Sequence, residues 1–531
     1  MNNARNTNHM LQLLQPAIGS CRTMECFGRL SATAGTSNTA RAWFRNVTAM
    51  AGATMVTAGL SNPLIKTNRK DTGSLVQNRP VWMVCAGQSN KDDNRRLCHS
   101  MAGNNSGPVR TDLNDVCCSE RLEAALKSLK ACPQNDSYWQ TINSPIVQLV
   151  RLLSPAVAVD QPGNFIISPL SLAYPLTLLA CGAGGDTRTE MAHLLGGGKP
   201  GDLIQSLAGL QQLGQSLAGS DQIKMVNAVY VCNDFPLRPE FNNLQNGSLT
   251  SFGKTDGHIR SIFESRSDLS TNTFMDHINR LTCESTGGMI DSLLSEPLPA
   301  PALMAILNAL HFQGHWQNTA SKTTMDFRDG DQQVHHNIPA VMVNNVNYRQ
   351  CKIQGQDWAV AWSPYSGNQY GLLLAMPVGN EGAANLNAPE VYEQVSKAIF
   401  TEAVGRRVTA VFPGFRLASA WQLRGPLQKA RLLQKAFDPA EADFSQLSAS
   451  ATKGSAFHIG NIIHKASVNV DEYGTEASAA TLVLTERCAP QTHSFDKPFK
   501  AFIVNQKTKT PCFEISISQK PEPPAERNQN S

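Results

Sequence analysis

Cys488 is a candidate nucleophile by residue type, because a thiol can act as one where histidines elsewhere in the chain come close to it. No cysteine-protease signature surrounds it, and the chain contains no G-x-S-x-G, H-E-x-x-H or C-x-x-C motif. The glycine-rich segment Cys181–Met191 also lacks the spacing of a phosphate-binding loop. We therefore expect no enzymatic activity and no cofactor, and Cys488 is more simply one residue of an exposed loop.

The segment before Cys488 is unusually rich in small side chains. From Ala477 to Ala480 the chain favours helix by composition, but Gly474 and Pro490 leave little room for one. An extended segment of small residues could instead enter between two existing strands without clashing with the layers on either face. The segment is therefore expected to exist as an exposed loop or as an inserted strand, and the simpler alternative is an ordinary surface helix or loop.

This segment resembles the hinge and reactive-centre loop of the serpins, inhibitors whose loop baits a protease and then inserts into the central sheet. The family pattern is Glu, any residue, Gly, a small residue, Glu and a run of alanines, followed by an F-x-x-P-F-like return that matches 495–499. The resemblance assigns the hinge to Glu472, Gly474, Thr475, Glu476, Ala477, Ser478, Ala479 and Ala480.

Further motifs in chain order are similar to the serpin shutter, the region where the central sheet parts. Ser168, Asn308 and His464 each fall on one of these motifs, and a buried network of hydroxyl, amide and imidazole is costly when only half made. Trp316 and Glu472 would share a role at the top of the sheet, where the loop enters. Without the resemblance, a satisfied core histidine is the simpler interpretation of His464.

The resemblance covers residues 140–517 and implies an α+β fold: a large central mixed β-sheet with further sheets, about eight or nine helices and an exposed reactive-centre loop. We expect a disordered or targeting segment at 1–78, a cysteine-containing extension at 79–136, the serpin domain at 137–520 and a disordered tail at 521–531. Within the extension, Ser119 is expected to cap a helix, and Pro155 is expected to stop the next apolar helix.

The implied function is inhibition of a serine protease by suicide-substrate trapping, in which a covalent complex forms and the cleaved loop inserts into the sheet. The commonest family spacing places Cys488 before the scissile bond, whereas local similarity to serpins with Arg-Cys at the bond places Arg487 there. We favour Arg487, because a guanidinium can pair with the Asp of a trypsin-like specificity pocket. The alternatives are a non-inhibitory serpin, acting as a carrier or storage protein, and a Cys-stapled interaction module on a serpin scaffold.

Composition and charge limit the partners. A net charge of +4 in 531 residues argues against a broad nucleic-acid surface, and heparin binding is not evident because 195–222 is nearly uncharged. No apolar run of about eighteen residues occurs, so no membrane association is expected, and we expect a monomer.

Cysteines and sequons point to export. Of the 13 cysteines, seven lie in the first quarter of the chain, which suggests disulfides in an exported protein. Sequons begin at Asn46, Asn104, Asn135 and Asn246. We therefore expect a secreted, extracellular glycoprotein.

Overall fold

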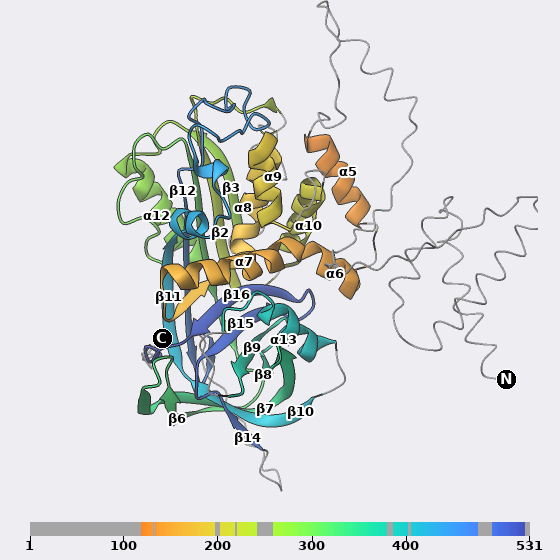
Figure 1. Ribbon diagram of the computed structural model, residues 1–531, viewed down its shortest axis with the longest axis vertical. Coiled ribbons are helices and arrows are strands. Elements are labelled where there is room, and N and C mark those ends of the chain that lie inside the picture. Colours follow the sequence, from red (N-terminus) through yellow and green to blue (C-terminus); the bar gives the residue numbers. More distant parts are fainter. Residues whose placement is uncertain are drawn as a thin grey trace, which may run out of the picture. The chain divides into compact units, whose positions relative to one another are not determined.

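Two β-sheets with helices packed on their faces form the body of the protein, here seen as a computed structural model (Figure 1). The structure describes residues 118–130, 132, 134–196, 202–217, 220–239, 241, 259–379, 386–401, 405–475 and 491–525. Most of the predicted reactive-centre loop, 476–490, lies outside these residues.

The central sheet has seven strands in the order β3-β2-β4-β12-β13-β5, and β11 pairs with the other side of β12. These strands are β2 (Ile223–Cys232), β3 (Ile259–Arg266), β4 (Met304–Phe312), β5 (Gly314–His315), β11 (Phe415–Gln422), β12 (Asn461–Asp471) and β13 (Gly474–Thr475). Every residue of β4 is buried, because α8 (Pro169–Gly182) packs on one face of the sheet and α12 (Asn272–Thr286) on the other.

Strands β4 and β12 are parallel neighbours, whereas β2 and β11 flank them in antiparallel orientation. The pairing of β4 with β12 begins where Ala305 is opposite Asn461 and ends where His311 is opposite Ser467. Beyond Ser467, the short strand β13 turns back against β12 and also pairs with β5. The central sheet therefore has a parallel seam at its middle, and the described start of the predicted hinge, Gly474 and Thr475, lies at one end of that seam.

The second sheet has nine strands in the order β1-β16-β15-β9-β8-β7-β10-β14, with β6 paired to β7. They are β1 (Phe165–Ile167), β6 (Ala320–Arg328), β7 (Val334–Ile353), β8 (Gln356–Pro364), β9 (Tyr370–Pro377), β10 (Arg406–Pro413), β14 (Thr492–Ser494), β15 (Phe499–Asn505) and β16 (Thr510–Ile517). Helix α8 contacts β16 of this sheet as well as β2 and β4, so it lies between the two sheets. The shared core is continuous through this helix.

The described residues form nine α-helices, and the predicted α+β fold with a large central mixed sheet is confirmed. Besides α8 and α12 they are α5 (Cys118–Lys130), α6 (Asp136–Ile142), α7 (Ser144–Asp160), α9 (Gly185–Leu194), α10 (Asp202–Leu217), α13 (Val391–Phe400) and α14 (Arg424–Lys429), with a 3₁₀ turn at Lys435–Phe437. None of these helices combines the length and apolar character that a bilayer crossing requires.

Three local expectations differ from the structure. Ser119 lies inside α5, which starts at Cys118, and Leu122 joins the main core through packing of α5 on α10. Pro155 does not stop α7, which continues to Asp160, because burial of the following turn around Val157 offsets the lost backbone hydrogen bond. Residues 521–525, expected within a disordered tail, are described and make specific contacts.

Candidate functional site

The predicted shutter residues meet beneath the parallel seam. Ser168 is the N-cap of α8, and its side chain accepts a hydrogen bond from the backbone N–H of Ser171. The backbone N–H of Ser168 donates to Nε2 of His464 at 2.9 Å. Because Nε2 accepts, the imidazole proton is on Nδ1, which lies 3.4 Å from the Ser171 hydroxyl. The start of α8 is thereby fixed to the middle of β12.

Asn308 and His464 are directly opposite each other across the seam, and Asn227 is opposite Asn308 on the other side. The Asn308 amide donates to the carbonyl of Ser171 at 3.1 Å, and the amides of Asn308 and Asn227 meet at 3.2 Å. All of these side chains are buried. The structure therefore brings together the three residues predicted for the shutter, on β12, β4 and the start of α8.

Burial has a direct electrostatic consequence at His464. Desolvation disfavours the imidazolium and lowers the pKa of His464 from 6.5 to about 3. Protonation of Nε2 would also direct its new N–H against the N–H of Ser168. The shutter thus requires neutral His464 at physiological pH.

A turn at Asp471 comes directly before the predicted hinge, and Oδ1 of Asp471 accepts the backbone N–H groups of Tyr473 and Gly474. Gly474 has φ 143°, and a Cβ there would lie 2.1 Å from the carbonyl oxygen of Gly314. Only glycine fits both the backbone conformation and the close approach to β5. This is the physical reason for glycine in the hinge motif.

Thr475 follows directly and is fully buried, with an exposed fraction of 0%. Its hydroxyl lies 2.7 Å from the hydroxyl of Tyr365, and its backbone pairs with Val470 on one side and Gly314 on the other. The first two residues of the hinge strand are therefore already part of the central sheet.

Trp316 closes this end of the sheet. Its indole Nε1 donates to the carbonyl of Asp471 at 2.9 Å, and its ring stacks on Tyr365 with centroids 4.8 Å apart. The backbone N–H of Trp316 donates to the carbonyl of Tyr473. Trp316 thus contacts the residues on both sides of half-buried Glu472, and their shared role stays a prediction.

The other predicted site residues, Glu476, Ala477, Ser478, Ala479, Ala480, Arg487 and Cys488, lie outside the described residues. Sequence reasoning gave no role to Ser171, Asn227, Tyr365 or Asp471. Ser171 lies three residues after Ser168, so its place beside a predicted shutter residue was the available signal. Tyr365 lies 110 residues before Thr475, and only the fold brings the two hydroxyls together.

A comparison with models of protein families identifies the family of this chain. Residues 148–515 match the family model described as serpin (serine protease inhibitor). The chain belongs to the serpin family. Its membership fits the closed parallel seam, the polar network below it, and Gly474 and Thr475 at its end.

Two related serpins and one solved structure align with this chain over nearly their whole length. Iripin-1 from Ixodes ricinus is 25% identical over 384 residues, 70% of this serpin and 92% of its own length. Serpin B8 from Bos taurus is 26% identical, covering 68% of this serpin and 95% of its own length. The structure of native protease nexin-1 with heparin has a TM-score of 0.57 at 21% identity and covers 72% of this serpin and 99% of that chain. Such structural likeness shows the shared fold.

Proposed function

We propose that this serpin inhibits trypsin-like serine proteases by suicide-substrate trapping and is not itself an enzyme. The observation that carries the proposal is the docked hinge, with β13 between β12 and β5 at the end of the parallel seam. A strand continuing from Thr475 would run antiparallel to β12, and also to β4 because these two strands are parallel. Insertion would thus replace one parallel pairing by two antiparallel pairings, which adds backbone hydrogen bonds.

The geometry of the seam suits such an insertion. Residues 476–487 would extend ~40 Å at roughly 3.3 Å per residue, enough to follow the seam past the shutter. A protease held as an acyl-enzyme at Arg487 would be carried along the same path. The trap would be kinetic, because insertion has to be faster than deacylation.

The reactive bond is proposed to follow Arg487, with Cys488 on its carboxyl side. A guanidinium and the buried Asp of a trypsin-like pocket form a charge-assisted, bidentate pair that a thiol cannot form. Heparin binding is not proposed, since α10 has Asp202 as its one charged residue.

Incubation with trypsin tests the proposal. We expect a complex that survives denaturing electrophoresis and a released carboxyl-terminal peptide whose mass shows Cys488 as its first residue. Cleavage without a stable complex would instead support the non-inhibitory alternative, a carrier or storage serpin. A peptide beginning at Ala489 would assign the bond to Cys488 and would contradict the trypsin-like specificity.

Secretion and glycosylation are part of the same proposal. Asn135 is exposed and caps α6 through its side-chain oxygen, which accepts from Tyr138, so this contact leaves the amide nitrogen available for a glycan. A decrease in mass after enzymatic deglycosylation of protein from secreting cells is the expected result. Protein that stays inside the cell without glycan would contradict secretion.

A further inference from the structure

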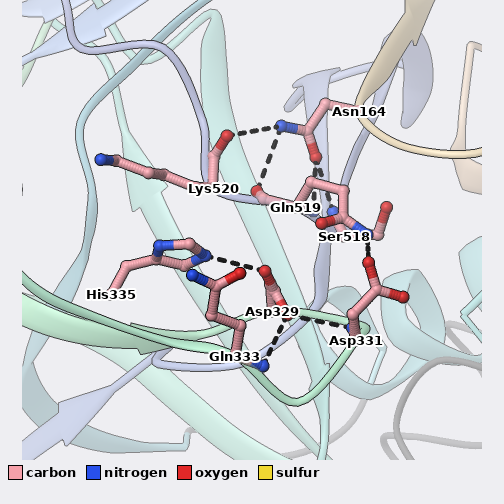
Figure 2. Close-up of polar contacts among 8 residues, drawn as sticks. All are labelled: Asn164, Asp329, Asp331, Gln333, His335, Ser518, Gln519 and Lys520. Atoms are coloured by element: carbon pink, nitrogen blue, oxygen red, sulfur yellow. Dashed lines mark hydrogen bonds and ion pairs between the residues drawn. The ribbon is translucent and has the colours of Figure 1, made fainter.

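Residues 518–525 follow the last strand, β16, and cross from one sheet to the other; we call them the C-terminal strap. Asn164 holds its beginning (Figure 2). Its Oδ1 accepts the backbone N–H groups of Ser518 and Gln519, both at 2.8 Å, and its Nδ2 donates to the carbonyl of Gln519 at 3.1 Å. The side chain of Asn164 therefore binds both N–H groups and a carbonyl group of the strap backbone.

The turn between β6 and β7 provides a second attachment. The backbone N–H of Gly330 donates to the carbonyl of Ser518 at 2.7 Å, and Nε2 of Gln519 donates to Oδ2 of Asp331 at 3.1 Å. The first half of the strap is thus bound to the second sheet on two sides.

A buried carboxylate makes this turn rigid. Asp329 is 3% exposed, and its Oδ1 accepts the backbone N–H groups of Asp331 and Gln333. Its Oδ2 lies 2.7 Å from Nε2 of His335, as Figure 2 shows. Because the turn is internally satisfied, it can serve as a fixed anchor for the strap.

The second half of the strap reaches the central sheet at β11. There the backbone N–H of Arg416 donates to the carbonyl of Glu522 at 3.0 Å, so that the strap forms a β-bridge with this strand. Pro524 covers Gly414, since a Cβ on Gly414 would lie 2.9 Å from Cγ of Pro524. The strap therefore lies directly on the start of β11.

The strap ends on β12. The backbone N–H of Ala525 donates to Oδ1 of Asn469 at 3.0 Å, and Asn469 is 6% exposed. Asn469 lies beyond Ser467, where the pairing of β12 with β4 has ended, and two residues before Asp471 of the hinge turn. The strap contacts β12 where β4 no longer does.

We propose that the C-terminal strap is a latch that ties the hinge end of β11 and β12 to the second sheet and slows the parting of β12 from β4. A strand that lacks one neighbour opens more easily, and its unpaired backbone groups can pair with another chain. The latch supplies attachments for β12 and its edge neighbour where the seam ends. This inference does not depend on protease inhibition, because opening of the seam can be measured without a protease.

Four variants test the latch. A chain ending at Lys520 loses the contacts to β11 and β12 but keeps those to Asn164 and the turn. Gly414→Ala displaces Pro524 without shortening the chain. The matched controls are a chain ending at Ala525, which keeps every contact described above, and Gly425→Ala, where a Cβ meets nothing within 4 Å.

Hydrogen exchange of peptides covering 463–475 and the rate of oligomer formation on mild heating are the measurements. We expect the chain ending at Lys520 and Gly414→Ala to exchange faster and to form oligomers about tenfold faster, the ratio that ~1.4 kcal/mol produces. Both controls should behave as the full chain does. If exchange and oligomer formation are unchanged in Gly414→Ala and in the shortened chain, the latch is refuted; if the shortened chain does not fold, Gly414→Ala decides alone.

Discussion

Acid should destabilise this serpin through His464, and the structure gives the size of the effect. The unfolded chain binds a proton at this histidine below its ordinary pKa of 6.5, whereas burial holds the folded pKa at about 3. The folded-state pKa is depressed, so the free energy of unfolding is unaffected above pH 6.5 and decreases as the pH falls from 6.5 towards 3. The loss is about 2 kcal/mol at pH 5 and approaches about 5 kcal/mol below pH 3, at 1.36 kcal/mol per pKa unit.

His464→Gln isolates this contribution, because the amide oxygen can accept from Ser168 but does not titrate. Urea denaturation, followed by tryptophan fluorescence at pH 7 and pH 5, should give a free energy of unfolding that falls by about 2 kcal/mol less in the variant than in the wild type. Groups that titrate elsewhere contribute equally to both proteins and cancel in this difference. His193→Gln is the matched control, because His193 is exposed, and it should keep the wild-type dependence on pH.

This reasoning would be refuted if the free energy of unfolding had the same dependence on pH in the wild type and in His464→Gln. If wild type and His464→Gln lose the same free energy between pH 7 and pH 5, His464 is not held neutral in the fold. The hydrogen bond from Ser168 would then have to be absent in solution, and the shutter geometry would be wrong.

Three further predictions concern the hinge and the reactive bond. Tyr365→Phe removes the partner of the Thr475 hydroxyl, so we expect the hinge to be less stable by about 1 kcal/mol and hydrogen exchange at Thr475 to be faster; unchanged exchange would show that the contact does not hold the hinge. Thr475→Arg places a charge in a fully buried position at a cost of several kcal/mol, so we expect more serpin cleaved per protease inhibited, and an unchanged stoichiometry would contradict insertion through the docked hinge. Arg487→Ala should weaken inhibition of trypsin at least about a hundredfold, in line with roughly 3 kcal/mol for a desolvated charge pair, whereas Arg487→Lys should keep much of it. Equal inhibition by all three proteins would remove Arg487 from the reactive bond.

Much of the fold could be predicted, because short sequence motifs along the chain resemble those of a known family. Asn308 and Trp316 were both predicted at the central sheet, and the segment that joins them forms the second half of β4 and the whole of β5. The run of consecutive buried residues in β4 is what a strand covered on both faces requires. The shutter was predictable for the same reason, since Ser168, Asn308 and His464 each lie in a short motif.

Other contacts could not be predicted, because their partners are distant in sequence and carry no motif of their own. Tyr365 gives no local sign that its hydroxyl meets Thr475. The continuation of α7 past Pro155 depends on burial against the rest of the molecule, which overrides the local preference of proline. A disordered tail was predicted at 521–531, yet Glu522 accepts a hydrogen bond from the backbone of Arg416 and Ala525 donates one to Asn469.

The sequence by itself predicted a hinge, because the resemblance to serpins rests on a local pattern of a glycine followed by small residues, and small side chains allow an extended segment to enter a packed sheet. It also determined the residue types of the shutter, since their chemistry must be satisfied in a buried place. Only the tertiary structure decided how the described part of the hinge is held: Gly474 and Thr475 are inside the sheet, between β12 and β5. That position depends on the distances to Gly314 and Tyr365, which are set by the packing of two sheets and are not encoded by the hinge residues themselves.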